Sequence, residues 1–238
     1  MTYKKIKIVD TMSSEEVLDL LFDDMKFLQY RIDENRNKYK RLARLSRDND
    51  NRIYYSPLNF QSNRGFHYIL QFFKRGKDEK ENDKLGVLYF AWYVWKRGVY
   101  AVVFSRIRKL NIYKYHYVLF TPHFIDRYRE RFLKDMSISK IDAFYKYYIG
   151  NLKDTFIEMP SEKYPDNVWK FCNQGMILCS SQKNDNLEAK TFITYDMAGI
   201  DQKLLALEGQ KAMMEMGFEL NLPEEDFEDF NIDFSPES

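Results

Sequence analysis

The chain has little of the material from which disulfide-stapled and metal-centred proteins are built. Its 238 residues include only two cysteines and three histidines. Two cysteines are too few for a disulfide framework, and small buried thiols are the expected outcome. The histidines, His67, His116 and His123, are too scattered along the sequence to propose a metal site. We therefore expect no metal and no cofactor.

Long apolar runs and phosphate-binding loops are also missing. No stretch approaches the roughly 20 apolar residues that a membrane-spanning helix requires, and the first ten residues lack the apolar centre of a signal peptide. No glycine-rich phosphate loop, paired Cys/His zinc spacing or nucleophile elbow occurs. The sequence predicts a cytoplasmic protein with no membrane partner.

Charge is unevenly distributed, although the net charge is only +1. Residues 219–238 contain eight acids and no Lys or Arg, which leaves 28 of the 36 acids to face all 37 basic residues in the rest of the chain. A basic body suits phosphate-bearing partners. The acidic tail, residues 218–238, is expected either to be flexible or to lie across a basic surface, which would give a protein partner or self-association through the tail.

The N-terminal segment, residues 1–50, is predicted to be helical. Ser13 and Glu16 form a capping box, and apolar residues then recur at helical spacing from Val17 to Ile32. The end of the helix is basic and has no acid; the cations of interest there are Arg36, Lys40, Arg41 and Arg44. They are either a solvated helix end, which suits the helix dipole, or an arm that binds nucleic acid.

An α+β body is predicted at residues 51–217, either as one core or as two subdomains at 51–120 and 121–217. Its first half is rich in β-branched and aromatic residues and predicts a meander of five strands at 51–62, 65–75, 84–97, 98–109 and 112–121. A pair of helices follows, at 122 onward and 137–152, then three strands at 167–172, 176–181 and 189–196 and a final helix at 199–217. Short connections between successive strands favour a mainly antiparallel sheet.

The stretch TPHFIDRYRERF (Thr121 to Phe132) places polar residues on one side of a predicted helix. His123, Arg127 and Glu130 fall at helical spacing, opposite a set of aromatic residues. Such a set suits cleavage of RNA without a metal, with His123 as base or acid, Arg127 on the phosphate and Glu130 as the orienting group. The alternative is an ordinary charged stripe on a surface helix.

Residues 117–197 resemble the small endoribonuclease fold shared by RelE-type toxins, barnase and their relatives. The resemblance lies in an H-x-x-x-R-x-x-x-R helix, here His123, Arg127 and Arg131, followed by a second helix and a sheet that ends in KTFITYD. It implies an endoribonuclease in which a polar residue of the late strand, Thr191, Thr194 or Tyr195, completes the catalytic set. Tyr195 is the residue we select as the fourth catalytic candidate.

A row of tyrosines adds a second feature typical of nucleic-acid binding. Tyr113, Tyr115 and Tyr117 alternate along one predicted strand and would form a stacking platform for bases, unless they are half-buried in the sheet. The sequence therefore predicts a protein that processes or binds nucleic acid, RNA in particular. The alternative is a non-catalytic interaction protein that uses an aromatic sheet and a basic helix to hold a protein or nucleic-acid partner.

Overall fold

A computed structural model describes the backbone of residues 6–46, 52–76, 85–109, 112–151, 158–160, 166–182 and 186–215. Side chains are described at these positions except at 105–109, 112–115, 158, 160 and 213. The fold is α+β, as the sequence predicts, with helices near both ends of the described chain and mainly antiparallel strands between them. The acidic tail lies outside the described residues.

The chain divides into two compact units, Met1–Tyr117 and Val118–Ser238. Unit 1 therefore includes the N-terminal helix together with the first strands. Its elements are α1 (Ser14–Leu45), β1 (Ile53–Tyr54), β2 (Leu58–Gln61), β3 (His67–Lys74), β4 (Leu85–Trp95), β5 (Gly98–Lys109) and most of β6 (Ile112–Phe120), which crosses the division. The strand order in this unit is β1-β3-β4-β5-β6, and β2 also pairs with β3.

The strands of unit 1 follow the predicted meander with one correction. Residues 51–62 were expected to form one strand, and they form two, β1 and β2, on either side of Ser56 and Pro57. Proline lacks the backbone N–H that a continuous ladder requires. The turn between β4 and β5 is tight: Trp95 pairs with Gly98, and Lys96 and Arg97 both adopt positive φ angles, 47° and 61°, as in a type I′ hairpin.

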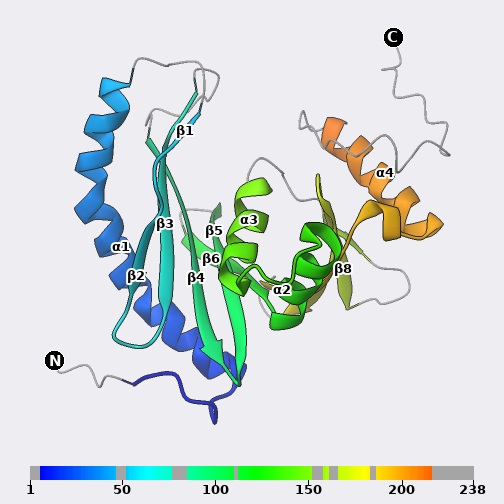
Figure 1. The fold of residues 1–238 in the computed structure, drawn as a ribbon, viewed down its shortest axis with the longest axis horizontal. Coiled ribbons are helices and arrows are strands. Elements are labelled where there is room, and N and C mark those ends of the chain that lie inside the picture. The colour runs from blue at the N-terminus through cyan, green and yellow to red at the C-terminus, as the bar shows by residue number, and fades with distance from the viewer. Residues whose placement is uncertain are drawn as a thin grey trace. The chain divides into compact units, whose positions relative to one another are not determined.

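Helix α1 lies along one face of this sheet (Figure 1). The predicted capping box is present, with both the Ser13 and the Glu16 side chains bonded to backbone N–H groups. The apolar side of the helix is buried against the strands, and aromatic contacts join the two layers: Phe22 lies 5.9 Å from Phe104, and Tyr39 stacks on Phe72 at 4.4 Å between ring centroids. The apolar residues whose spacing predicts the helix are thus the residues that α1 packs against the sheet.

A polar contact is buried inside this otherwise apolar layer. The Tyr68 hydroxyl of β3 donates a hydrogen bond of 2.9 Å to the carboxylate of Asp24 on α1. The Arg64 guanidinium lies 3.8 Å from the same carboxylate and donates to the Leu20 carbonyl. Burial, and then the neighbouring Asp24 charge, raise the pKa of Tyr68 far above its usual range. This bond ties α1 to the centre of the sheet.

Unit 2 contains the remaining elements. They are α2 (Pro122–Tyr128), a π-helical turn η1 (Arg129–Leu133), α3 (Lys140–Gly150), β7 (Glu158–Pro160), β8 (Asn167–Cys172), β9 (Gly175–Gln182), β10 (Asn186–Ile193), the 3₁₀ turn η3 (Tyr195–Met197) and α4 (Ile200–Glu215). The strand order is β6-β10-β9-β8-β7. Residues 118–120 of β6 pair with β10 in parallel, and the other pairs of this unit are antiparallel.

The hairpin between β8 and β9 has a tighter turn than its sequence suggests. The predicted strands at 167–172 and 176–181 leave three residues for the turn, but Cys172 pairs with Gly175, so the turn has only two residues. Gly175 adopts a φ of 151°, and a β-carbon there would lie 2.3 Å from the Ile193 carbonyl oxygen. Only glycine therefore fits at this position of the hairpin. Both cysteines are free and buried, as predicted.

The two faces of the unit 2 sheet are covered by different helices. On one face, Phe124 and Tyr128 of α2 lie 6.0 and 5.2 Å from the ring of Phe192. On the other face, Phe171 and Met176 form a core cluster with residues of α4. Helix α2 is therefore held on β10 by its aromatic side, which leaves its polar side for the surface.

A second buried polar contact joins α2 to the neighbouring elements. The Tyr128 hydroxyl donates to the Gln174 side-chain oxygen at 3.0 Å, and the Asn151 amide donates to the same oxygen at 2.8 Å. Burial raises the pKa of Tyr128 above its usual range. The contact fixes the end of α2 to the β8–β9 turn and to the end of α3.

Candidate functional site

The start of α2 is fixed to β10 by one threonine. The Thr121 hydroxyl accepts the N–H of Phe124 at 3.2 Å, which caps the helix, and donates to the Ala189 carbonyl at 3.0 Å. Pro122 occupies the first turn, where its missing N–H costs nothing. The predicted helix start is confirmed, and the bond to Ala189 sets where the following polar residues lie relative to β10.

The polar face of α2 has the composition that the sequence predicts. Phe124, Ile125 and Tyr128 are buried, whereas His123 and Glu130 are exposed. Arg127 lies between these two and is half-exposed. The helix therefore presents an imidazole, a guanidinium and a carboxylate on one side. We call His123, Arg127, Glu130 and the following Arg131 the α2 cluster.

Within the α2 cluster, Arg127 contacts both of its polar neighbours. Its Nε lies 3.5 Å from His123 Nε2, and its Nη1 donates to Glu130 Oε2 at 2.5 Å. In this contact the guanidinium N–H is the donor and Nε2 of the imidazole is the acceptor. The guanidinium is thus oriented by one side chain of α2 and one of η1.

Arg131 projects from the π-helical turn η1 and is anchored to the sheet. Its Nη1 donates a 2.5 Å hydrogen bond to the Phe192 carbonyl of β10. Burial and then the nearby positive charge of Arg127 lower the pKa of Arg131. The charge of Arg127 thus acts on Arg131, while the charge of Glu130, which is paired with Arg127, acts in the opposite sense. Such π-turns are frequent at functional sites.

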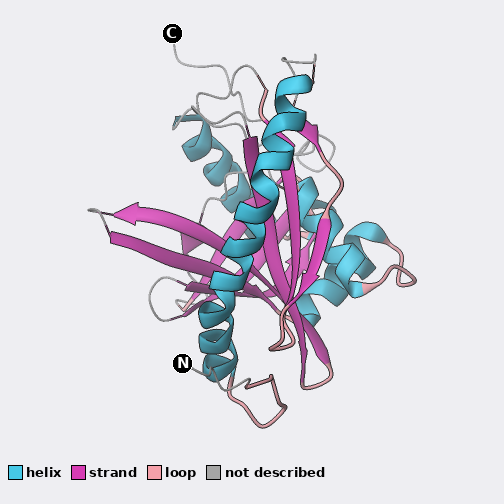
Figure 2. Cartoon of the chain, turned by 90° about the vertical axis from the view of Figure 1, so that its left-hand side faces the viewer, coloured by secondary structure: helices cyan, strands magenta, loops and turns pink. Residues whose placement is uncertain are grey.

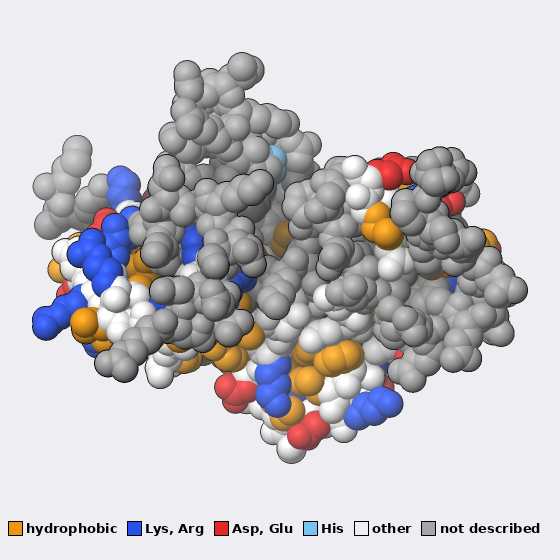
Figure 3. Space-filling view, turned by 90° about the horizontal axis from the view of Figure 1, so that it is seen from above, with side chains coloured by type: hydrophobic (Ala, Val, Ile, Leu, Met, Phe, Trp, Pro, Cys, Tyr) orange, Lys and Arg blue, Asp and Glu red, His pale blue; other side chains and the backbone are white. Residues whose placement is uncertain are grey.

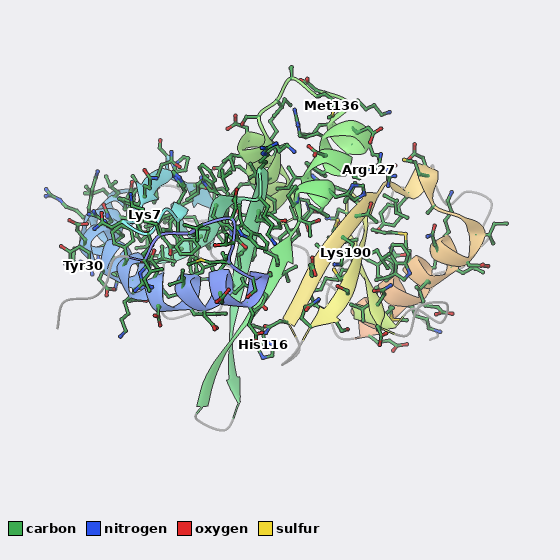
Figure 4. The ribbon with its side chains drawn as sticks, turned by 90° about the horizontal axis from the view of Figure 1, so that it is seen from below. Lys7, Tyr30, His116, Arg127, Met136 and Lys190 are labelled. Atoms are coloured by element: carbon green, nitrogen blue, oxygen red, sulfur yellow. The ribbon has the colours of Figure 1, made fainter. Side chains whose placement is uncertain are left out.

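The facing strand, β10, has an irregularity of its own. Ala189 pairs with Cys179 and Thr191 pairs with Leu178, so Lys190 is an extra residue that forms a β-bulge. The Lys190 side chain is half-exposed and forms an ion pair with Glu188 at 2.7 Å. Figure 4 shows Arg127 on α2 and Lys190 on the strand beside it. Neither the bulge nor Lys190 was predicted, because a one-residue insertion leaves no signal in the alternation of a single strand.

The other cations of this helix are used in local structure. Asp126 pairs with Arg129 at 3.2 Å and with Lys140 of α3 at 2.6 Å. Arg129 also donates to the Met136 carbonyl. These contacts hold the connection between η1 and α3, so Arg129 belongs to the scaffold of the cluster.

The late-strand candidates are placed differently from the α2 cluster. Tyr195 is buried, and its hydroxyl donates to the Cys172 carbonyl at 2.7 Å. It packs with Phe171 in the core beneath α4. Thr191 and Thr194 are partly buried. The structure does not bring Tyr195 together with His123 and Arg127, because the sheet buries its ring on the α4 side.

The remaining nucleic-acid candidates belong to unit 1. Arg41 and Arg44 are exposed on α1, whereas Arg36 and Lys40 are half-buried. Lys and Arg side chains are prominent on the described surface of this unit, at the left of Figure 3.

The tyrosine row is described only at its last member. Tyr117 is half-buried and lies 5.6 Å from the ring of Phe22 on α1. The side chains of Tyr113 and Tyr115 lie outside the described residues. The stacking platform therefore stays a prediction for these two, and Tyr117 has an aromatic partner inside its own unit.

Neither a cluster of metal-ligating side chains nor a membrane-spanning helix is found among the described residues. No group of three or more His, Cys, Asp or Glu side chains among these residues is arranged to hold a metal ion. None of the described helices is both long enough and apolar enough to cross a membrane. No family model, curated protein or solved structure matches this chain.

Proposed function

We propose that unit 2 binds the phosphate groups of nucleic acid, with RNA as the ligand to test first, through Arg127 and Arg131 of the α2 cluster. The observation that carries the proposal is that Arg127 and Arg131 are one helical turn apart and are both held in place, Arg127 by His123 and Glu130 and Arg131 by the Phe192 carbonyl. Burial and then the charge of Arg127 lower the pKa of Arg131. Holding two cations together costs free energy, and an anion bound between them would offset that cost. Guanidinium groups pair well with phosphate because they donate two parallel hydrogen bonds.

The anchoring of the two side chains supports the same proposal. Arg131 is held by the Phe192 carbonyl and Arg127 by His123 and Glu130. Side chains that are already oriented lose less conformational freedom when a ligand binds. Lys190 on the bulge of β10 is a further cation of unit 2, and it is paired with Glu188.

Binding is better supported than cleavage. Cleavage of RNA by its 2′-hydroxyl requires one group that accepts a proton and another that donates one. His123 is available for one of these roles, but Glu130 is engaged with Arg127, and the Tyr195 hydroxyl is buried against the Cys172 carbonyl. We therefore propose phosphate binding as the function and treat cleavage by His123 as a separate outcome of the experiment.

The test is a binding titration of labelled single-stranded RNA, followed by fluorescence anisotropy at several salt concentrations. We expect Arg127→Gln to weaken binding about three- to tenfold near 0.1 M salt and to reduce the slope of log K against log salt by roughly 0.7, the value for one lost phosphate contact. Lys146→Gln is the matched control, because Lys146 is an exposed cation of α3 outside the α2 cluster. Equal binding by the two variants would refute the proposal.

Cleavage is read from the same RNA on a denaturing gel. If the protein cuts RNA, His123→Ala should abolish the cut, whereas RNA binding in the anisotropy titration should weaken less than in Arg127→Gln, because the guanidinium remains and only its contact with the imidazole is lost. If the RNA stays intact, the binding proposal is unaffected, and the endoribonuclease activity implied by the resemblance is ruled out for this RNA.

A further inference from the structure

The outer side of α1 carries a regular stripe of exposed residues. At 100° per residue, its members fall within about 40° of Tyr30, on the side opposite the buried residues of the helix. All are exposed; they are Glu16, Asp19, Asp23, Lys26, Tyr30, Glu34, Asn37, Arg41 and Arg44. No other described element of unit 1 lies in front of α1 in Figure 2.

The charges of α1 change sign along the helix. Its first twelve residues, 14–25, contain five acids and no Lys or Arg, whereas residues 35–46 contain five Lys or Arg and no acid. Tyr30 lies midway between the two blocks, is 62% exposed and stands at the outer margin of unit 1 (Figure 4). The helix is therefore acidic at one end, basic at the other, and marked by an exposed aromatic ring at its centre.

If a second copy of α1 is placed antiparallel to the first, with Tyr30 facing Tyr30, the charges of the two stripes are complementary. Reversal brings Glu16 opposite Arg44, Asp19 opposite Arg41, Asp23 opposite Asn37 and Lys26 opposite Glu34. Three of these four pairs join opposite charges, and the fourth joins a carboxylate to an amide. Each pair would occur twice between two copies of the helix. In a parallel arrangement, by contrast, like charges would face one another along the whole stripe.

We propose that two copies of this chain associate through α1, antiparallel, with Tyr30 facing Tyr30 at a two-fold axis. Symmetric self-contacts of this kind are the commonest in soluble oligomers. The stripe from Glu16 to Arg44 spans about 42 Å at 1.5 Å per residue, so the contact is long. Asp19, Lys26, Arg41 and Arg44 have no ion-pair partner among the described residues and are available for a second copy.

Several members of the stripe already have partners in their own chain. Glu34 pairs with Arg31 at 2.8 Å, Asp23 lies 3.6 Å from Arg64, and Glu16 accepts the Ser13 N–H. Exposed ion pairs contribute little individually. The association should therefore be weak and salt-dependent, and it should depend most on the pairs formed by Asp19 and Arg41 and on the central tyrosine.

Charge exchange tests the proposal with the full-length chain. Sedimentation should show a species of twice the chain's 28.8 kDa at low salt, which dissociates as salt approaches about 0.5 M. Asp19→Arg alone and Arg41→Asp alone should each weaken association at least about tenfold, because each places like charges in contact. The double variant D19R/R41D should restore it, which also shows that the changed chains are folded.

Cross-linking tests the position of the axis. Helices whose axes lie about 10 Å apart bring facing Cα atoms to about 5 Å, within the range that a disulfide bridges. Tyr30→Cys should therefore form a covalent dimer on mild oxidation, and the two buried native cysteines should not interfere. Asn37→Cys is the control, because its two copies would be about 21 Å apart in the antiparallel pair.

The outcomes separate the proposal from its alternatives. A chain that is monomeric at low salt, or a dimer that D19R leaves intact, would show that α1 is not the contact. Cross-linking of Asn37→Cys as readily as of Tyr30→Cys would mean a parallel pair and would overturn the proposal. If the Arg41 variants change RNA binding but not the sedimentation, the basic end of α1 serves nucleic acid instead of a second copy.

Discussion

Each of the two units buries one tyrosine hydroxyl to fix a helix on its sheet, but the two hydroxyls have different acceptors. In unit 1, Tyr68 donates to the carboxylate of Asp24, which has Arg64 beside it. In unit 2, Tyr128 donates to the amide oxygen of Gln174, which also accepts from Asn151. The first contact is part of a charged group, and the second is part of a neutral one.

Because the acceptors differ, removing the hydroxyl leaves a buried carboxylate in unit 1 and a neutral amide in unit 2. Without the Tyr68 hydroxyl, Asp24 keeps a buried charge with a single, more distant cation. Without the Tyr128 hydroxyl, the Gln174 oxygen still accepts from Asn151. A buried charge that loses a hydrogen bond costs more free energy than a neutral group that keeps one of two. Unit 1 should therefore depend more strongly on its tyrosine than unit 2 does.

The largest effect is expected for Tyr68→Phe. Because hydrogen bonds to charged groups contribute about 1.5–3 kcal/mol, we expect the free energy of unfolding to fall by about 2 kcal/mol, measured by urea denaturation. Asp24→Asn in the Tyr68→Phe background is the control, since it removes the stranded charge and should recover part of the loss. A loss of unfolding free energy below about 0.5 kcal/mol would contradict the expectation that unit 1 depends more strongly on its tyrosine than unit 2 does.

A smaller effect is expected for Tyr128→Phe. The hydroxyl makes a neutral hydrogen bond, and such bonds contribute about 1 kcal/mol, so the free energy of unfolding should fall by about that amount in the same urea experiment. The change lies next to the α2 cluster but not in it, so RNA affinity measured on the folded variant should stay within about twofold of the parent. A loss larger than that of Tyr68→Phe would reverse the comparison.

The smallest effect concerns pH and only unit 1. His67 stacks on Trp92 at 3.9 Å, and burial lowers its pKa below the usual 6.5. The neutral ring is therefore favoured in the folded state, so its contribution to stability is complete above pH 6.5 and is lost as the pH falls below that value. His67→Gln should make the melting temperature less dependent on pH between about 5 and 7. An unchanged pH dependence would show that His67 does not contribute.

Much of the fold was predictable because local patterns and tertiary structure agree. The capping box at Ser13 and Glu16, the cap at Thr121 and the hairpin turn at Lys96 were each visible from a few neighbouring residues. The split of the first strand at Pro57 could have been found from the proline itself. The parallel pairing of β6 with β10 could not, because it joins residues about 70 positions apart and no local pattern encodes it.

For the candidate site, the sequence could predict which residues share a side of the helix, but not which residues of other elements lie beside them. Helical spacing correctly grouped His123, Arg127 and Glu130 on the polar side of α2, since a helix fixes which residues share a side. It could not place Tyr195, whose position depends on the fold of the following strand. The anchoring of Arg131 by the Phe192 carbonyl was also hidden, because it requires the π-turn and the strand to be in place together.

The bulge at Lys190 shifts the alternation of side chains between the two faces of β10 by one residue. Ala189 and Phe192 are three positions apart, yet their partners on β9, Cys179 and Ile177, are two apart, so both side chains point toward α2. Deleting Lys190 would leave Ala189 and Phe192 two positions apart, so an unbulged β10 would keep the same partners on β9 and the ring of Phe192 on the same face. Deleting Thr191 instead would leave Lys190 opposite Leu178 in its place, so at this point the strand should tolerate the loss of one residue, whereas the loss of a second residue would reverse the face of Phe192.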